Sequence, residues 1–199
     1  MPRLIDYGAR FELAREAVLA VTLRDGAAAV NMQTVSRELG VSVATVRRFV
    51  SNAQGLPQLG LGFIERRRMV RRFTGGGVAA LRDPPLQRLM AAVRLELPLT
   101  EGQLAQDRAW EALVAANSGP TIDKFVEDQQ AEWQHLAGAV IVALGVPEAQ
   151  RPLEVATLIA LMNGLLVQLV SAEITPGIAI AVIDPHLFDL AAHRSDGVA

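Results

Sequence analysis

Apolar residues along this 199-residue chain recur three and four positions apart, and no stretch alternates strictly between apolar and polar. Spacing of three and four lines one face of an α-helix, whereas alternation is typical of a half-buried strand. The pattern therefore predicts an all-α fold without internal repeats. Glycine, proline and capping residues divide it into nine helices, over Arg3–Arg24, Gln33–Leu39, Ala44–Phe49, Leu56–Leu81, Pro84–Leu95, Glu101–Ala116, Thr121–Leu144, Pro147–Ala172 and Pro176–Ala191.

Between Asn31 and Leu56 the pattern describes two short helices joined by a glycine turn. Gly40 supplies the left-handed backbone that the turn requires, and Val46 and Val50 point inward from the second helix at i and i+4. The first helix has one apolar stripe, made of Met32, Val35 and Leu39. This arrangement predicts a helix-turn-helix, the commonest device for placing a helix in the major groove of DNA.

The polar positions around this turn suit a surface that contacts DNA. Asn31 and Ser42 are N-cap residues of the two helices, and small side chains and arginines occupy the outward positions of the second helix. A helical hairpin in any globular domain could contain the same turn, so the motif alone leaves a structural role open. The residues expected at the DNA interface are Asn31, Gln33, Thr34, Ser42, Val43, Ala44, Thr45, Arg47, Arg48 and Phe49.

Charge is divided unevenly along the chain. Residues 1–72 contain 12 Arg and six acidic residues, a net of +6, whereas residues 73–199 contain seven Lys plus Arg and 15 acidic residues, a net of −8. Binding to a polyanion needs local positive charge, which the overall charge of −2 conceals. We therefore expect a DNA-binding domain over residues 1–55 and a ligand-binding and dimerisation domain over residues 56–199, the latter beginning with a connecting helix over residues 56–81.

The predicted connecting helix contains five arginines, Arg66, Arg67, Arg68, Arg71 and Arg72. At about 1.5 Å of rise per residue they lie roughly 15 Å from the helix start that would face DNA. Ion pairing with the acidic body, with Asp107 or Glu111 as partners, is therefore preferred over a solvated face, and direct DNA contact comes last. The run Gly75–Gly77 marks either a soft point in this helix or a plain surface break.

The composition excludes several chemical classes. The chain has no cysteine, which rules out disulfides, thiolate metal ligands and a cysteine nucleophile, and is compatible with a reducing cytoplasm. The first residues place Arg3, Asp6 and Arg10 around an apolar run too short for a signal peptide, so we expect a cytoplasmic protein.

The segment Val155–Ala172 runs for 18 residues without a charge, the lower limit of what spans a bilayer. Asn163 and Gln168 interrupt it, and Glu154 and Glu173 flank it. We therefore expect no membrane span, and prefer a helix buried on nearly all sides at a subunit interface.

A family resemblance rests on the order of residues in the first third of the chain, which is Arg10, Leu13, Ala17, Gly26, Val35, Ser36, Gly40-Val41-Ser42, Ala44-Thr45-Val46, Phe49 and Leu56. This order resembles the DNA-binding head of the tetracycline-repressor (TetR) family. The nine-helix layout extends the resemblance over nearly the whole chain. So does Ala160–Leu166, which is similar to the family's Asp-Gly-Leu-containing dimerisation helix.

Three positions depart from the family pattern. Members usually have tyrosine where this chain has Arg47, a second aromatic where it has Val50, and a lysine at the start of the fourth helix where it has Ala53. The tyrosine and the lysine generally hold DNA phosphates. Arg47 can restore one phosphate contact or pair bidentately with a guanine. The alternative interpretation is a TetR-like helical dimer that binds a ligand or a protein and has lost specific DNA binding.

The resemblance implies a DNA-binding transcriptional regulator, most often a repressor. It implies a homodimer closed by the last two helices as a four-helix bundle, bound to a palindromic operator in double-stranded DNA and released by a small-molecule effector. No cofactor is implied. The candidate effector contacts, among the central helices, are Met90, Leu97, Trp110, Leu113, Phe125, Gln129, Trp133 and Asn163. Their mix suggests an apolar or aromatic effector with one or two polar groups.

Catalytic and metal-binding patterns are weak. Glu132 and His135 form a single Glu-x-x-His, whereas a di-iron bundle needs two such helices and further carboxylates. His186, Asp189 and His193 share a helical face, but such groups near a terminus are more often solvated than metal-bound. No nucleophile elbow, phosphate loop or dinucleotide fingerprint is present. We therefore assign no catalytic or metal residue and expect no enzyme; a helical-bundle enzyme or metal protein is the third, least favoured hypothesis.

Overall fold

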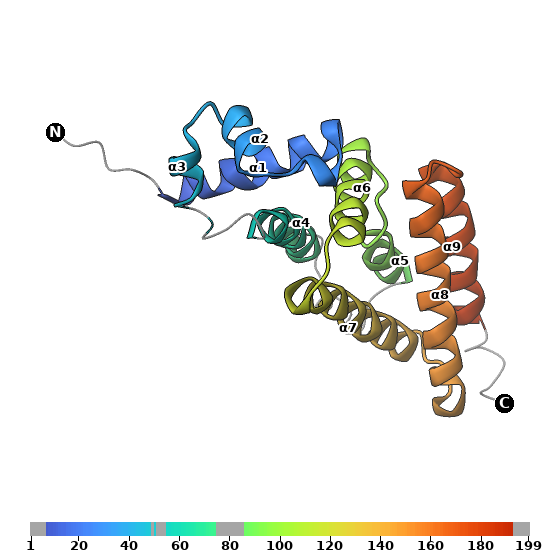
Figure 1. The fold of residues 1–199 in the computed structure, drawn as a ribbon. Helices are drawn as coiled ribbons and strands as arrows, with labels where there is room; N and C mark the ends of the chain where they lie inside the picture. The colour runs from blue at the N-terminus through green and yellow to red at the C-terminus, as the bar shows by residue number, and fades with distance from the viewer. Residues whose placement is uncertain (1–6, 49, 51–54, 75–85, 193–199) are drawn as a thin grey trace. The chain divides into compact units, whose positions relative to one another are not determined.

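The computed structural model describes residues 7–48, 50, 55–74 and 86–192 (Figure 1). Within these residues the chain is all-α, with no strand, so the predicted fold class is confirmed. The α-helices are α1 (Tyr7–Asp25), α2 (Met32–Glu38), α3 (Val43–Val46), α4 (Gly55–Thr74), α5 (Leu86–Arg94), α6 (Glu101–Ala116), α7 (Pro120–Ala143), α8 (Arg151–Val170) and α9 (Pro176–Ala192). Two short 3-10 helices, η1 (Ala27–Ala29) and η3 (Glu148–Gln150), lie between them.

Each α-helix in the described part of the chain overlaps a predicted one, but two of the described boundaries differ by more than two residues. The second helix of the helix-turn-helix was expected over Ala44–Phe49, and α3 already ends at Val46. The helix expected from Pro147 is interrupted, because η3 comes first and α8 begins only at Arg151. Pro152 explains the break: a proline in a helix interior lacks the N–H that the preceding turn needs, whereas the first turn tolerates it.

Several predicted features lie outside the described residues, so the structure does not test them: the start of the first helix at Arg3, Phe49, Ala53, the run Gly75–Gly77, the start of a helix at Pro84, and His193.

The chain divides into two compact units, each with its own core. Unit 1 comprises residues 1–67 and 105–125, and unit 2 comprises residues 68–104 and 126–199. The dividing points fall inside α4, α6 and α7. Helices α6 and α7 contribute apolar residues to the cores of both units, whereas the described apolar core residues of α4 belong to unit 1. The functional boundary expected at residue 55 stays a prediction.

Helices α1 to α3 and the start of α4 form the first cluster of unit 1. The predicted inward residues Val35, Val46 and Val50 are buried there, while Met32 and Leu39 are partly buried against them. The rest of the cluster comes from α1 and α4, with Ala14, Ala17, Val18, Leu56 and Leu59. The hydrophobic pattern of the helix-turn-helix is therefore confirmed.

In the second cluster of unit 1, α4 packs against α6 through Leu61, Ile64, Ala109, Trp110 and Leu113. Gly60 lies where α4 comes closest to its neighbours in this unit. A Cβ at this position would be 2.9 Å from side-chain atoms of both Val18 and Leu113, closer than ordinary van der Waals contact. Any larger residue at position 60 would therefore force the Val18 or Leu113 side chain to shift, so packing rather than backbone angles favours glycine here.

The core of unit 2 is built by α5, the start of α6, α7, α8 and α9, and it includes Leu89, Val93, Leu97, Trp133, Val140, Leu158, Met162, Ile183 and Leu187. Figure 1 shows α8 and α9 running side by side. Arg94 of α5 donates to the Asp184 carboxylate of α9, with 2.9 Å between Nε and Oδ1. This hydrogen bond raises the pKa of Arg94 above its ordinary value, so the guanidinium stays charged, and the pair joins α9 to α5.

Candidate functional site

The first helix of the helix-turn-helix begins with a capping box. The Asn31 carboxamide oxygen accepts from the N–H groups of Gln33 (2.9 Å) and Thr34 (3.0 Å), and the Thr34 hydroxyl accepts from the Asn31 N–H (3.1 Å). These bonds satisfy donors that the first helical turn otherwise leaves unpaired. The predicted cap at Asn31 is confirmed, while DNA contact by these residues stays a prediction.

The turn between the helices has the geometry that the sequence predicts. Gly40 has φ +64°, in the left-handed region, and the Val41 N–H donates to the Ser36 carbonyl at 3.0 Å. Ser42 then caps α3, because its hydroxyl accepts from the Thr45 N–H at 3.2 Å. Local hydrogen bonds therefore support both the turn and the second cap.

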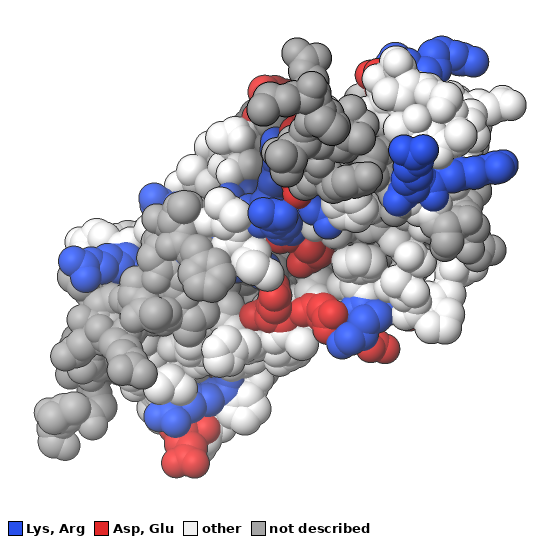
Figure 2. Space-filling model, turned by 90° about the vertical axis from the view of Figure 1, so that its left-hand side faces the viewer, with Lys and Arg blue, Asp and Glu red and all other residues white. Residues whose placement is uncertain are grey.

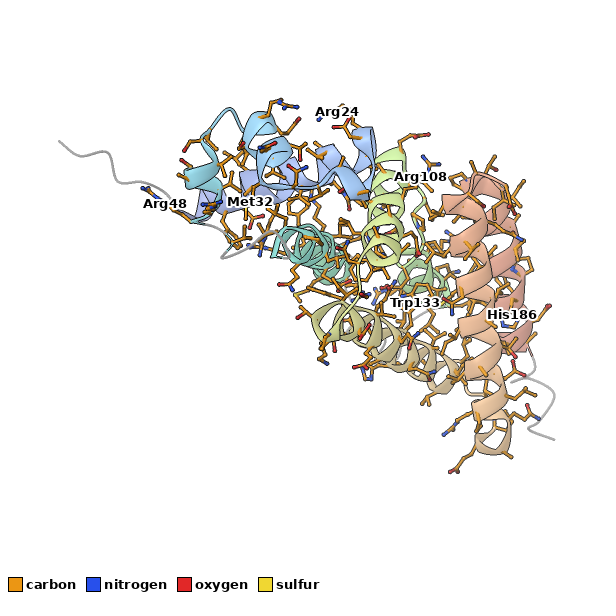
Figure 3. The ribbon with its side chains drawn as sticks, viewed as in Figure 1. Arg24, Met32, Arg48, Arg108, Trp133 and His186 are labelled. Carbon is orange, nitrogen blue, oxygen red and sulfur yellow. The ribbon has the colours of Figure 1, made fainter. Side chains whose placement is uncertain are left out.

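Polar and cationic side chains cover the outer side of this motif. Arg47 and Arg48 are exposed just after α3, and Ala44 and Gln33 are exposed as well. Figure 3 labels Arg48. Val43 and Thr45 are half-buried. Because Val46 and Val50 are buried beneath these residues, the structure separates an inner apolar side from an outer polar one, as expected.

Arg37 is an exposed cation that the sequence-based list omits. It lies in the last turn of α2, one helical turn after Gln33, on the same exposed side of that helix. The i, i+4 spacing from Gln33 is the signal that could have identified it. Arg37, Arg47 and Arg48 make no ion pair within the described residues, so their charges remain available for phosphate groups.

The first arginines of the α4 cluster pair with α1 within unit 1. Arg66 Nη1 lies 2.9 Å from Glu12 Oε1, and Arg67 Nη2 lies 3.7 Å from Glu16 Oε1. The Arg67 guanidinium also lies over the Phe63 ring, 4.5 Å from its centroid. These arginines do form ion pairs, but the expected partners in the acidic body, Asp107 or Glu111, are wrong for Arg66 and Arg67, whose partners belong to α1. On the face drawn in Figure 2, basic and acidic side chains adjoin one another in the same way.

Arg72, at the end of α4, enters a polar network in unit 2 that the sequence does not reveal. Its Nε lies 2.7 Å from Glu96 Oε1 and its Nη2 lies 2.8 Å from Glu96 Oε2. Trp133 Nε1 donates to the same Oε2 at 3.3 Å, and Arg72 also pairs with Glu132. The Glu96 side chain is only 5% exposed, so a charged group is held inside an otherwise apolar core.

The structure divides the eight candidate effector contacts between the two units. Met90, Leu97 and Trp133 lie in the core of unit 2. Trp110, Leu113 and Phe125 belong to the second cluster of unit 1, where the rings of Trp110 and Phe125 meet edge to face with their centroids 6.1 Å apart. Gln129 is half-buried and Asn163 is exposed on α8. Contact between any of them and an effector stays a prediction.

Helices α8 and α9 bury one side in unit 2 and leave the other open. We call the open side the α8–α9 face; it comprises Leu153, Ala156, Thr157, Ala160, Asn163, Gly164, Val167 and Gln168 of α8, and Ile178, Ala181, Val182, Pro185 and Phe188 of α9. Leu153 is 68% exposed and Val167 is 64% exposed. In the single chain the buried residues of α8 line one side of the helix. The expected burial of its open side at a subunit interface stays a prediction.

Among the described helices, one is long and apolar enough to cross a membrane, the stretch Glu148–Val170, and 28% of its most apolar window is buried. The described residues contain no group of three or more His, Asp or Glu side chains placed to hold a metal ion. Of the weak metal motifs, Glu132 is paired with Arg72, and His135 is exposed.

Solved structures share this fold over nearly its whole length. A protein from Rhodococcus sp., described as a TetR-family transcriptional regulator, has a TM-score of 0.71 and 18% identity over 92% of this chain and 99% of its own. A transcriptional regulator from Pseudomonas aeruginosa PAO1 has a TM-score of 0.70 and 21% identity over 95% and 93%. A regulator from Saccharomonospora viridis, in complex with choline, has a TM-score of 0.69 and 21% identity over 94% and 97%. No family model and no curated protein matches the sequence.

Proposed function

We propose that this protein is a DNA-binding transcriptional regulator, a repressor that binds a palindromic operator as a homodimer and is released by a small-molecule effector. One observation supports this most directly: a capped helix-turn-helix with an outer cationic side occurs in a fold shared with solved regulators over more than nine-tenths of the chain.

The proposed DNA contacts are the exposed residues around α2 and α3. Arg47 and Arg48 supply charge next to the recognition helix, and small residues such as Ala44 let the backbone approach base edges. Arg47 takes the place of the usual phosphate-binding tyrosine, and a guanidinium can perform that role with a full charge. Arg37 adds a further cation in the last turn of α2.

The proposed dimer covers the α8–α9 face with the same face of a second copy. Contiguous apolar surface of this kind is unusual on a monomeric soluble protein and marks an interaction site. A membrane span is the weaker explanation of α8, because it would require pulling Leu158, Met162 and Leu169 out of the core of unit 2. Two copies of α8 and α9 would form a four-helix bundle, and two-fold symmetry would match a palindrome. In this arrangement Asn163 contacts the partner copy rather than an effector.

The proposed effector is a small organic molecule with apolar surface and one or two polar groups, bound among the residues that line the cores. The S. viridis regulator with choline supports the general idea that this fold accepts such a ligand. The effector releases DNA only if it binds one conformation of the protein more tightly than the other. The conformation that it prefers must be the one that cannot hold the operator.

The test is a binding titration of the purified protein with fragments of upstream genomic DNA, at several salt concentrations and with random-sequence competitor. We expect competitor-resistant binding to a palindrome and a steep loss of affinity with salt. Arg47→Ala should weaken that binding, and Arg88→Ala, an exposed arginine on α5, is the matched control. Weak binding that random DNA removes, unchanged by Arg47→Ala, would support the alternative of a TetR-like dimer that has lost specific DNA binding.

A further inference from the structure

Helix α9 has a proline in its interior, Pro185, and this residue belongs to the α8–α9 face. A proline has no N–H, so the Ala181 carbonyl, four residues earlier, lacks the hydrogen-bond donor that a helix normally supplies. The ring of a proline also crowds the carbonyl four residues before it. Ala181 and Pro185 are both exposed, so this carbonyl oxygen lies on the open side of α9.

The same face has a side chain with unused donors. Asn163 is exposed on α8, and its carboxamide makes no hydrogen bond with any of the described residues. The Thr157 hydroxyl, by contrast, donates to the Leu153 carbonyl of its own helix at 2.9 Å. The α8–α9 face therefore combines a backbone acceptor that lacks its helical donor with an amide whose donors are unpaired.

Asn163 and Ala181 lie at a similar height along the two helices. Helices α8 and α9 run side by side in opposite directions, joined by residues 171–175 (Figure 1). Asn163 lies seven residues before the end of α8 and Ala181 five residues after the start of α9, so at about 1.5 Å of rise per residue both lie roughly 8–10 Å from this connection. Both positions are therefore close to the middle of the face, whereas Gln168 lies nearer the connection.

In the proposed homodimer this donor and this acceptor can satisfy each other. A two-fold axis builds an interface from the same surface patch on both copies. An axis through the middle of the α8–α9 face brings the middle of α8 against the middle of α9 of the second copy, so the contact between Asn163 and the carbonyl occurs twice.

Burial makes this pairing necessary. Apolar residues of the face exclude water once the interface forms, and a buried carbonyl without a donor is unfavourable. The hydrocarbon region of a membrane has no hydrogen-bond donor and would leave both groups unpaired. A second copy of this chain is therefore the occupant that satisfies the polar groups of this face as well as its apolar ones.

We propose that the Asn163 carboxamide of each copy donates to the Ala181 carbonyl of the other, so that Pro185 makes a backbone oxygen the recognition site for a second copy of this chain. This rests on the proposed function, because it assigns the contact that sets the register of the proposed homodimer. A polar pair in an apolar interface specifies register, since a shifted arrangement buries both groups without partners.

The test is a double-mutant cycle in the full-length protein, with the dimer dissociation constant measured by sedimentation of fluorescently labelled protein over a dilution series. Asn163→Leu removes the donor at similar side-chain volume and should raise the dissociation constant by roughly tenfold or more. Pro185→Ala restores the backbone N–H that the Ala181 carbonyl lacks. In the Pro185→Ala protein, Asn163→Leu should therefore no longer raise the dissociation constant.

Gln168→Leu is the matched control, since it makes the same change from an amide to leucine on the same face. Its effect on the dissociation constant should be equal in the wild-type and Pro185→Ala proteins. All three positions are exposed in the single chain, so the variants should fold, and circular dichroism checks this.

Two results would overturn this hydrogen bond and leave the homodimer in place. One is an Asn163→Leu effect that is equal in the wild-type and Pro185→Ala proteins, and the other is an unchanged dissociation constant of Asn163→Leu itself. A wild-type chain that stays monomeric at the highest concentration measured would instead overturn the proposed homodimer, and the recognition site with it. None of these measurements requires DNA, so they are independent of operator binding.

Discussion

The helix-turn-helix side of unit 1 and the α8–α9 face of unit 2 are both exposed, yet their chemistry is opposite. The first presents the cations Arg47 and Arg48 over a small apolar cluster. The second presents Leu153 and Phe188, 68% and 50% exposed, and α8 has no charged residue after Glu154. Exposure alone therefore does not define function. A polyanion binds to a positively charged surface, whereas an interface with a second copy of the chain buries apolar surface.

The ion pairs of the two units differ in how far they are buried. In unit 1, Arg24 pairs with Asp25 and Glu38 at the surface, where water and salt weaken the attraction. In unit 2, Glu96 is buried, and losing its partner would leave a charge without solvation. Arginine–carboxylate pairs therefore contribute little to stability at the surface of unit 1, whereas loss of the buried pair in unit 2 would strongly destabilise it.

The largest expected effect follows from placing a charge on the α8–α9 face. Val167→Asp should dissociate the proposed homodimer, because an unpaired buried carboxylate costs about 3–5 kcal/mol. Sedimentation velocity would measure the change, and operator affinity should fall with it. Val142→Asp on α7, which is 54% exposed and is not one of the residues of this face, is the matched control and should remain dimeric. A dimeric Val167→Asp protein would refute the assignment of this face.

A smaller effect is expected from the cationic side of unit 1. Arg47→Ala should cost about 1–3 kcal/mol of operator binding if the guanidinium pairs with a base, and relax specificity at one position. If it holds a phosphate, affinity should fall evenly across sequences and the salt slope should decrease by about 1. Titrations against operator and scrambled DNA separate the two roles. If Arg47→Ala leaves the affinity for operator DNA and for scrambled DNA unchanged, Arg47 does not contact DNA.

Two glycines on α4 provide a comparison within one helix. Gly60→Ala should destabilise the fold by about 1–3 kcal/mol, because its Cβ would lie 2.9 Å from Val18 and Leu113 atoms. Gly62→Ala should be neutral or stabilise by up to about 1 kcal/mol, since the nearest atom, Phe125 Cζ, is 4.0 Å away. Urea unfolding of both variants measures the difference, and equal stabilities would contradict the close packing at residue 60.

The smallest effect is expected at the exposed pair of unit 1. The hydrogen bond from Arg24 lowers the pKa of Asp25. The stability that the ionised Asp25 carboxylate contributes is therefore present above the usual aspartate pKa, and it is lost as the pH falls through the lowered pKa. Because the pair is fully exposed, Asp25→Asn should leave the urea midpoint at pH 7 within experimental error. A clear loss at pH 7 would mean that this surface network matters more than its exposure indicates.

The helix-turn-helix could be predicted in detail because its determinants are local. The Asn31 and Ser42 caps, the left-handed Gly40 and the inward Val46 each depend on residues within about four positions, and the structure contains all of them. The break at Pro152 could have been predicted from the same rules, although the helix was drawn through it. The proposed DNA contacts follow from these positions and await the binding test.

The effector region could not be predicted in the same way. Trp110 and Trp133 look alike in the sequence, both aromatic residues at helical spacing, yet they lie in the cores of different units. Periodicity shows that a side chain is buried but not what it is buried against. The eight candidates were therefore chosen by residue type, and the structure separates them.

By itself, the sequence determined the all-α class, the helices and the local geometry of the helix-turn-helix, because capping, turns and periodicity act over a few residues. Only the tertiary structure decided that Arg72 pairs with Glu96 and Glu132, 24 and 60 residues away, and that a Cβ at Gly60 would lie 2.9 Å from Val18 and Leu113 atoms. It also decided which side of α8 stays open. These features depend on which helices pack together, and the free energy of that packing is summed over the whole core rather than encoded in any short segment.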